Sequence, residues 1–136
     1  MTENEIKKIF EDFEKLKVLI VGDVMIDKYV YGKVERVSPE APVPVVDVQR
    51  TDSRLGGAGN VALNLSSLGS KPILCSIIGD DDAGNELIEL FFNHNGLDTK
   101  GIIKSNNRKT TIKTRIIGNQ HQLLRIDSEI KDDLNK

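Results

Sequence analysis

The sequence contains one cysteine and no tryptophan, and it has no long apolar run. The lone thiol, Cys75, excludes an internal disulfide, and its place in the apolar run 72–78 favours a buried side chain over a reactive one. No run approaches the roughly 20 apolar residues that cross a bilayer, so no membrane partner is expected. Residues 1–5 are polar and acidic, so a secretory signal is not expected either. Together these absences predict a cytoplasmic protein.

The chain also lacks an excess of basic residues. Lysine and arginine number 19 against 21 aspartates and glutamates, which gives a net charge of −2 and a pI near 5.7. A dedicated nucleic-acid-binding protein usually carries a basic excess on one face, so nucleic acid is not expected as a partner. A hydrophobic content of 38% and a length of 136 residues fit one globular domain with its own core.

Strands and helices alternate in the pattern of apolar residues. Continuous apolar runs predict buried strands, and repeats at three and four residues predict helices. Thr2 and Glu5 have the spacing of a capping box, whereas Gly69 and Gly96 are expected to end the second and third helices. The expected helices span 2–16, 56–68 and 83–95, with another beginning in the charged tail 128–136, and the expected strands span 17–21, 72–78 and 101–104.

Four further strands are expected outside this alternation. Pro42 and Pro44 confine one of them to a sheet edge or to a sheet exposed on one side, and Gly118-Asn119 predicts the turn of a hairpin. Alternating strands and helices predict an α/β fold with a parallel sheet, and the extra strands predict a smaller, half-exposed sheet set against it. These extra strands span 29–37, 43–48, 110–117 and 122–127.

Two carboxylates follow the first buried strand. Asp23 and Asp27 come after Gly22, at the carboxyl end of a strand, where open α/β sheets collect their ligands. A carboxylate at that place can accept hydrogen bonds from two neighbouring hydroxyls of a sugar. The alternative is that both residues only cap turns.

Glycines open the second expected helix, in the run Gly56-Gly57-Ala58-Gly59-Asn60. They let backbone N–H groups approach a ligand, a helix N-terminus favours anions and hydroxyl oxygens, and Asn60 offers both a donor and an acceptor. The alternative is a tight loop that needs positive φ. The run also matches a dinucleotide-binding pattern, but residues 50–55 separate it from the preceding expected strand, which argues against a nicotinamide enzyme.

Basic residues gather on the expected hairpin, two of them on one face of a strand and one across the turn. Arginine binds phosphate through two parallel hydrogen bonds, so the cluster suits a phosphate group. The alternative is a solvated hairpin in which these side chains pair with Asp127 or Glu129. The residues expected to contact the substrate here are Lys113, Arg115, Gln122 and Arg125.

A metal site is not expected. Asp80, Asp81 and Asp82 precede a helix, where a cap is favoured over metal ligation. His94 and His121 have no ligand partners at zinc spacing.

Four segments resemble the ribokinase-like, or pfkB, carbohydrate kinases. Residues 18–27 look like their opening strand and sugar-binding turn, and residues 56–62 are similar to their glycine- and asparagine-bearing helix start. Residues 36–45, Arg-Val-Ser-Pro-Glu-Ala-Pro-Val-Pro-Val, and 119–127, Asn-Gln-His-Gln-Leu-Leu-Arg-Ile-Asp, are similar to more specific segments of heptose 7-phosphate kinases. The resemblance spans about residues 17–129.

The resemblance implies a partial ribokinase-like fold: a mostly parallel sheet with helices on both faces and a small β-lid from strands at about 28–50 and 109–127. Such lids often also form a homodimer interface. Asp27, Gly56, Gly57 and Asn60 would hold sugar hydroxyls. In the intact enzyme, the anomeric hydroxyl of a phosphorylated heptose would attack the γ-phosphate of ATP, with magnesium, in the synthesis of ADP-heptose for lipopolysaccharide.

The sequence departs from that family in one respect. The family's catalytic base lies in a Gly-Ala-Gly-Asp motif, but Gly57-Ala58-Gly59 is followed here by Asn60. The base and the ATP-binding portion are therefore expected beyond residue 136, and residues 1–136 are expected to form the N-terminal portion of one kinase domain, inactive alone and without a bound cofactor. The alternatives are a kinase for another phosphosugar and a non-catalytic sugar-binding or dimerising module.

Overall fold

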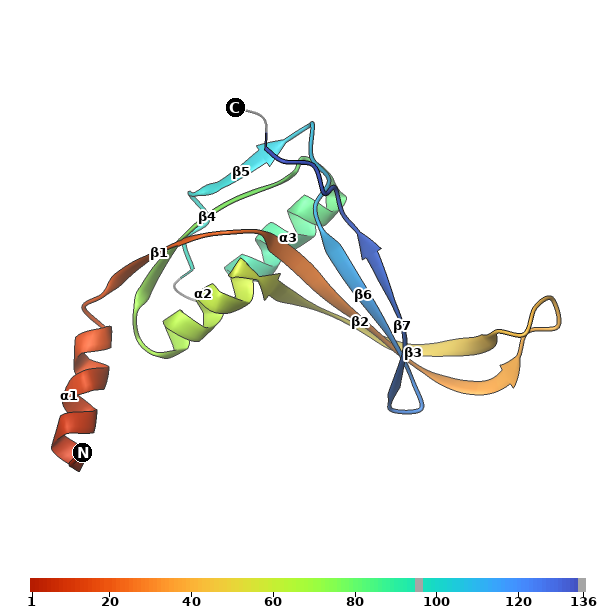
Figure 1. The fold of residues 1–136 in the computed structure, drawn as a ribbon, viewed down its shortest axis with the longest axis horizontal. Helices are drawn as coiled ribbons and strands as arrows, with labels where there is room; N and C mark the ends of the chain where they lie inside the picture. Colours follow the sequence, from red (N-terminus) through yellow and green to blue (C-terminus); the bar gives the residue numbers. More distant parts are fainter. Residues whose placement is uncertain (95–96, 135–136) are drawn as a thin grey trace.

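The computed structural model describes residues 1–94 and 97–134, which form two sheets that meet at a corner (Figure 1). Strands β1, β4 and β5 form a three-stranded sheet, and β3, β2, β6 and β7 form a four-stranded sheet, each in that order. The helices are α1 (Glu3–Phe13), α2 (Ala58–Ser67) and α3 (Asp82–Phe92), and the strands are β1 (Lys17–Val21), β2 (Val24–Val37), β3 (Pro44–Gly57), β4 (Lys71–Gly79), β5 (Ile102–Ser105), β6 (Ile112–Gly118) and β7 (His121–Ser128).

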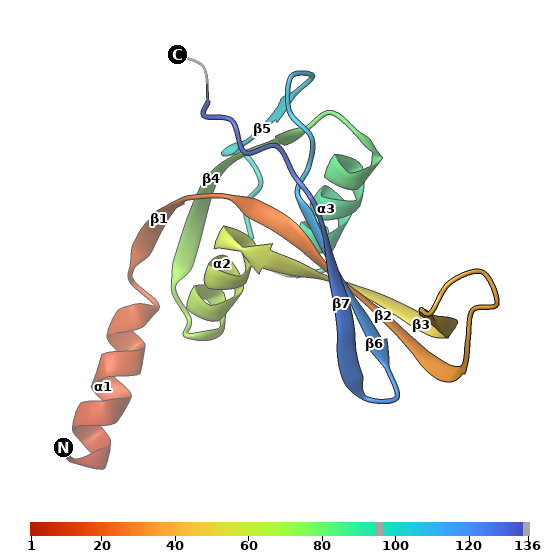
Figure 2. The same ribbon diagram turned by 45° about the vertical axis from the view of Figure 1, so that its right-hand side comes forward.

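The three-stranded sheet is parallel, as predicted, and packs α2 and α3 against one face (Figures 1 and 2). Gly59 of α2 and Phe91 of α3 are neighbours, since a Cβ added at Gly59 would be in contact with Cζ of Phe91 at 3.4 Å. The first residues of β2 and the last of β3 also reach this core, so both sheets share it. The buried cluster comprises Val24, Ile26, Leu55, Leu74, Ile78, Leu87 and Phe91.

The opposite face of the three-stranded sheet has no helix over it in the described part of the chain. Leu19, Val21 and Ile103 there are 62%, 77% and 64% exposed. Within the described residues, α2 and α3 both lie on the other side of this sheet. The bare face is apolar, and it is referred to below as the outer face.

The four-stranded sheet is the second sheet that the sequence predicts, but among the described residues it is the larger of the two sheets and not the smaller. Strand β2 pairs antiparallel with β3 and parallel with β6, and β6 and β7 form the predicted hairpin. Its turn uses Asn119 and Gln120, which have φ of 48° and 69°. Pro44 begins β3, which is an edge strand as predicted.

Strand β3 is longer than its sequence predicts. It continues through residues 50–55, which separate the expected strand 43–48 from the expected helix 56–68, and ends at Gly57. Those residues do not alternate clearly between apolar and polar types, but each pairs with a residue of β2, from Tyr31 opposite Arg50 to Ile26 opposite Leu55. The tertiary pairing therefore decides their conformation rather than their own propensity.

Helix α1 begins as the capping box predicts. Thr2 N donates to Oε2 of Glu5 at 2.7 Å, and Glu5 N donates to Oγ1 of Thr2 at 3.3 Å. The helix ends at Phe13 rather than Leu16, and Ile9 and Phe10 on its apolar side are 41% and 49% exposed. It extends away from the two sheets (Figure 1).

Three further expectations concern the end of α3, the C-terminal tail and Cys75. Helix α3 ends at Phe92, and the predicted cap at Gly96 lies outside the described residues. The tail forms no helix over residues 129–134, which corrects the expected start of one. Cys75 is half-buried rather than buried.

Within residues 1–94 and 97–134, no helix combines the length and the apolar character that crossing a membrane requires.

Candidate functional site

One face of the four-stranded sheet gathers most of the charged residues that the sequence singles out. Because side chains alternate along a strand, the register decides which residues share a face. Asp27 stands opposite Arg54 on one side and Lys113 on the other, and in the next row Tyr29 stands between Asp52 and Arg115. We call this surface the charged face: Asp27, Tyr29, Tyr31, Arg50, Asp52, Arg54, Lys113, Arg115, Arg125 and Asp127.

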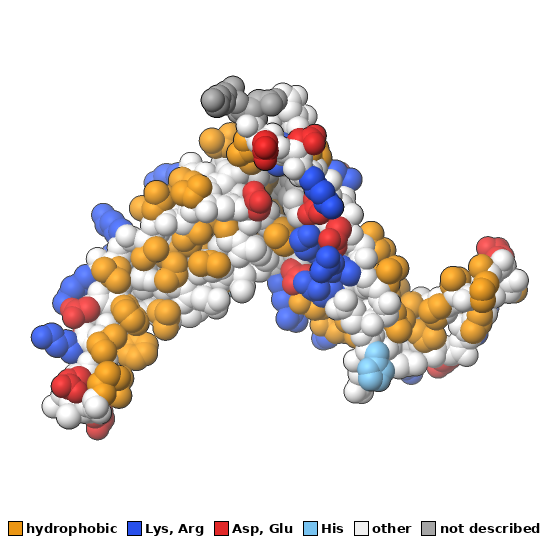
Figure 3. All heavy atoms as spheres, viewed as in Figure 1, with side chains coloured by type: hydrophobic (Ala, Val, Ile, Leu, Met, Phe, Trp, Pro, Cys, Tyr) orange, Lys and Arg blue, Asp and Glu red, His pale blue; other side chains and the backbone are white. Residues whose placement is uncertain are grey.

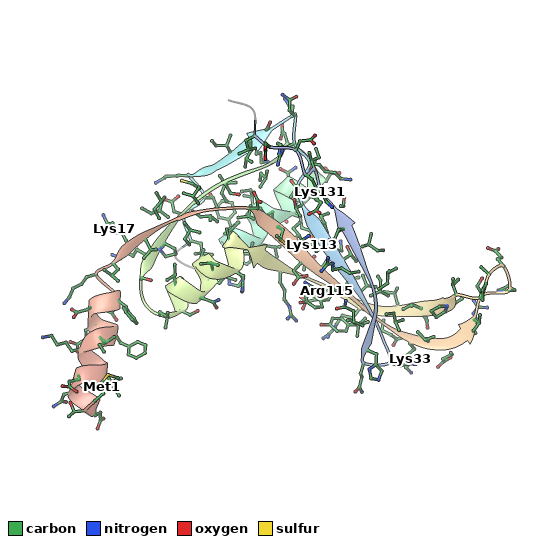
Figure 4. The ribbon with its side chains drawn as sticks, viewed as in Figure 1. Met1, Lys17, Lys33, Lys113, Arg115 and Lys131 are labelled. Atoms are coloured by element: carbon green, nitrogen blue, oxygen red, sulfur yellow. The ribbon has the colours of Figure 1, made fainter. Side chains whose placement is uncertain are left out.

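Most of the predicted substrate-binding residues lie on this face. Gly56 pairs with Met25, one row from Asp27, and Gln122 pairs with Ile117 near the tip of the sheet. Figure 3 shows Lys and Arg side chains with Asp and Glu between them over this part of the molecule, and Figure 4 labels Lys113 and Arg115 on β6. The predicted residues that share the face are Asp27, Gly56, Lys113, Arg115, Gln122 and Arg125.

The carboxylate of Asp27 is held by an arginine and a tyrosine. Arg115 donates from Nε to Oδ1 at 2.8 Å and from Nη2 to Oδ2 at 3.4 Å, and Tyr29 donates from its hydroxyl to Oδ2 at 2.9 Å. The hydrogen bonds to Asp27 raise the pKa of Arg115, so this guanidinium remains charged. A carboxylate accepts about four hydrogen bonds in all, so Asp27 retains capacity for a sugar hydroxyl while Arg115 fixes its orientation.

A second group of paired charges lies beside the first. Nζ of Lys113 is 3.1 Å from both Asp127 and Glu129, and Arg125 bonds Asp127 at 2.9 Å. The hydrogen bonds to Glu129 and Asp127 raise the pKa of Lys113, and those from Lys113 and Arg125 lower the pKa of Asp127. The pairs with Asp127 and Glu129 that we weighed as an alternative are therefore formed. An incoming phosphate would have to share these cations with their carboxylates.

Sequence reasoning missed the contribution of β3 to the charged face. The guanidinium of Arg50 lies 4.3 Å from the ring centre of Tyr31, and that of Arg54 lies 4.8 Å from Tyr29. The two tyrosine rings stack at 6.0 Å. Aromatic rings beside cations suit the apolar faces and the hydroxyls of a sugar. Had 50–55 been recognised as a strand, alternation would have placed Arg50 and Arg54 on one face, and the register with β2 makes that face the charged face.

The glycine run joins the charged face to α2. Gly57 has φ of 56°, and a Cβ there would collide with the carbonyl oxygen of Asp23, so this position requires glycine. A Cβ on Gly56 would lie 3.4 Å from Cβ of Asp27, so these two residues are neighbours. Asn60 lies exposed in the first turn of α2. Gly57 and Asn60 thus follow the charged face along the chain, and their contact with a ligand stays a prediction.

The structure also corrects the argument against a dinucleotide site. The glycines do end a strand, since β3 continues to Gly57. That strand, however, pairs antiparallel with β2 in the four-stranded sheet, whereas the dinucleotide fingerprint belongs to a βαβ unit of a parallel sheet. The antiparallel pairing of β3 therefore argues against a dinucleotide site, and a gap between the strand and the glycines does not.

A cavity of about 380 Å³ opens where the two sheets meet. Asp23 and Met25 border it at the start of β2, Arg108 and Lys109 before β6, and Glu129 after β7. Met25 and the bond between Glu129 and Lys113 connect this cavity to the charged face. The described residues include no group of three His, Cys, Asp or Glu side chains arranged to hold a metal, and Asp81 caps α3 by accepting from Gly84 N at 2.8 Å.

Comparison with known proteins agrees with this geometry. The sequence profile described as pfkB family carbohydrate kinase matches residues 15–136. The chain belongs to the pfkB family. Its fold is similar to that of a solved fructokinase with bound ATP from Xylella fastidiosa, with a TM-score of 0.55 and 23% identity over 82% of this chain and 32% of that one.

Curated relatives are more similar to this pfkB chain. A bifunctional protein HldE from Helicobacter pylori (strain P12) is 51% identical over 119 residues, which are 88% of this chain and 26% of the relative. One from Geotalea uraniireducens (strain Rf4) is 45% identical over 135 residues, which are 99% of this chain and 27% of the relative. The chain therefore spans about a quarter of the length of the curated relatives that it matches.

Proposed function

We propose that this chain forms the sugar-binding part of an ATP-dependent kinase that phosphorylates heptose 7-phosphate at its anomeric hydroxyl. The observation that carries the proposal is the identity of 45–51% with HldE proteins over 88–99% of the chain, in a member of the pfkB family. The charged face supplies what such a substrate needs, since carboxylate and amide groups suit hydroxyls and arginine suits phosphate. The product would serve the synthesis of ADP-heptose, a precursor of lipopolysaccharide.

Each predicted residue has a role in this proposal. Asp27, steered by Arg115, accepts hydrogen bonds from sugar hydroxyls, and the backbone at Gly56 and Gly57 lets the sugar approach α2, where Asn60 lies. The phosphate of the substrate competes for the cations that now pair with carboxylates. The residues proposed to contact it are Lys113, Arg115, Gln122 and Arg125.

Phosphoryl transfer needs groups that this sequence does not contain. In the intact enzyme, the anomeric oxygen would attack the γ-phosphorus of magnesium-bound ATP while the bond to the β-phosphate breaks and ADP leaves. A base from a Gly-Ala-Gly-Asp motif would take the hydroxyl proton, and the motif is absent from residues 1–136. We therefore expect the 136-residue chain to bind sugar without turnover. A coupled kinase assay that shows turnover well above the blank would contradict this.

The four-stranded sheet would act as a lid and as a dimer interface. Its charged face would cover the sugar and exclude water, which suppresses ATP hydrolysis. The face opposite to the charged face exposes Leu124 and Ile126, which are 56% and 51% exposed, beside Val30 and Ile116. Burial of these apolar residues against a second copy would stabilise a homodimer. The proposal places the enzyme in the cytoplasm, where ATP is available.

Calorimetric titration of the 136-residue chain tests the proposal. Heptose 7-phosphate should bind at least about tenfold more tightly than ribose, which has no phosphate, and than fructose 6-phosphate, whose carbon chain is one carbon shorter. Arg115→Met should weaken the binding of heptose 7-phosphate at least about tenfold, whereas Lys7→Met, an exposed change on α1, should not. Tighter binding of fructose 6-phosphate would favour another phosphosugar kinase, and binding of none of the three sugars would refute the proposal.

A further inference from the structure

A buried threonine connects the two sheets through a network outside the charged face. Thr110 is 1% exposed and lies in the segment that leads from β5 to β6. Its Oγ1 donates to Oδ1 of Asp81 at 2.7 Å and accepts from Gly79 N at 3.0 Å. Its own backbone N–H donates to Oδ2 of Asp81 at 3.0 Å. The hydroxyl of Thr110 and the carboxylate of Asp81 thus accept hydrogen bonds from the backbone N–H groups of Gly79 and Thr110.

The same carboxylate caps α3. Asp81 Oδ1 accepts from Gly84 N at 2.8 Å, so the cap and the link to Thr110 use one side chain. Burial alone would raise the pKa of Asp81, but the hydrogen bonds from Thr110 and Gly84 outweigh burial and hold the pKa below its ordinary value. The carboxylate is therefore ionised over the neutral range, and its hydrogen bonds are charge-assisted.

The surrounding backbone leaves little room for another arrangement. A Cβ on Gly79 would lie 2.6 Å from Oδ2 of Asp81 and 2.8 Å from the carbonyl oxygen of Arg108. A Cβ on Gly84 would collide with the carbonyl oxygen of Gly79 and lie 3.1 Å from Oγ1 of Thr110. The end of β4, the start of α3 and the approach to β6 are therefore packed directly against each other.

The network precedes the strand that carries two of the proposed substrate contacts. Thr111 follows Thr110 and accepts from Ile26 N at 2.9 Å, which starts the pairing of β6 with β2. Lys113 and Arg115 come next along β6, and Arg115 bonds Asp27 across that pairing. A shift of Thr110 would disturb the start of the pairing between β6 and β2, and that pairing sets the positions of Lys113 and Arg115.

We propose that Asp81 and Thr110 are positioning residues, which fix the four-stranded sheet against the three-stranded sheet and so set where Lys113 and Arg115 meet the substrate. The geometry needs the hydroxyl of Thr110, since it bridges Gly79 and Asp81. The expected effect on substrate affinity rests on the proposed function. The mechanical part of the proposal, that Asp81 and Thr110 fix the two sheets against each other, does not.

Amide hydrogen exchange measured by NMR on the 136-residue chain tests the mechanical part. Thr110→Val leaves Gly79 N–H and Asp81 Oδ1 without the hydroxyl, so exchange of the β6 amides should accelerate at least about fivefold. Thr110→Ser keeps the hydroxyl and should stay close to the unmodified chain. Ser70→Ala is the matched control, because Ser70 is also a buried hydroxyl, 7% exposed, and bonds Leu65 O at 2.7 Å away from β6. It should leave β6 unchanged.

Asp81→Asn provides the second variant, should Thr110→Val not fold. Asparagine caps helices as well as aspartate, so α3 persists while one acceptor for Thr110 is lost, and β6 exchange should again accelerate. Unchanged β6 exchange in the folded variants, or an equal acceleration by Ser70→Ala, would overturn the proposal.

Titration of the same proteins with heptose 7-phosphate separates the two proposals. The affinity should fall at least about fivefold in Thr110→Val and recover in Thr110→Ser. Accelerated β6 exchange with undiminished affinity would overturn the link to the substrate. If the unmodified chain binds no heptose 7-phosphate, the proposed function fails, and hydrogen exchange alone still decides the positioning role.

Discussion

The charge pair at the centre of the charged face illustrates how little stability and how much specificity one residue can contribute. The side chains of Arg115 and Asp27 are 26% and 20% exposed, so water screens their attraction and the net effect on folding is small. A sugar that binds between the lid and α2 would remove that water. The same carboxylate then interacts in a drier environment, where a hydrogen bond to a charged group is worth more.

Substitution of Asp27 should therefore separate affinity from stability. Asp27→Asn keeps the size of the side chain and removes its charge. We expect urea unfolding to show a loss of less than about 1 kcal/mol, while calorimetry shows heptose 7-phosphate binding at least about tenfold more weakly. Asp12→Asn breaks the exposed pair with Lys15 on α1 and should change neither. A stability loss without an affinity loss would assign Asp27 a structural role only.

At the scale of elements, the turn from β3 into α2 depends on a single backbone conformation. Gly57→Ala places a Cβ at φ of 56°, against the carbonyl oxygen of Asp23, and strain of this kind costs about 1–3 kcal/mol. Urea unfolding should show a loss of that size. Gly22→Ala is the matched control, since its Cβ would only contact Cβ of Ala58 at 3.4 Å. Equal losses in the two variants would mean that helix entry does not require this conformation.

The cap of α3 makes stability depend on pH. The pKa of Asp81 in the folded chain lies below its ordinary value, which is about 3.9 when unfolded. Its contribution is therefore complete above about pH 4 and is lost as the pH falls from there toward the folded pKa, because the unfolded chain binds the proton first. The stability difference between the unmodified chain and Asp81→Asn, measured by urea unfolding, should narrow as the pH falls below about 4. Ser70→Ala, which removes a buried hydroxyl and no titrating group, should show no such narrowing.

The elements also show what the sequence alone can predict. Apolar runs identified β1 and β4, and the spacing of Thr2 and Glu5 identified the cap of α1, because these signals are local. Residues 50–55 carry no such signal, since both faces of that part of β3 contain polar side chains, and only pairing with β2 makes them a strand. The sequence could predict which residue types form the candidate site. It could not predict that Arg50 and Arg54 lie on the charged face, because that depends on the register of β3 on β2.

For the whole molecule, the distribution of apolar surface matters more than any single contact. The outer face of the three-stranded sheet is bare in the described residues, and the face opposite to the charged face exposes a second apolar strip. Contiguous exposed apolar surface on a soluble chain marks an interaction surface or an aggregation hazard. Because the strips lie on different sheets, a chain that uses both can associate beyond a dimer.

Analytical ultracentrifugation over a range of protein concentrations should therefore reveal association in two separable steps. Val21→Lys combined with Ile103→Lys places charge at positions that are 77% and 64% exposed, so folding is preserved while the outer face can no longer bury apolar surface. This variant should sediment as a dimer, and further substitution of Leu124 and Ile126 by lysine should yield a monomer. Asp12→Asn on α1, which lies outside both apolar strips, serves as the control and should associate like the unmodified chain. A concentration-independent monomer in the unmodified chain would show that neither strip is used for self-association, and a monomer after the first pair of substitutions alone would exclude the lid as the dimer interface.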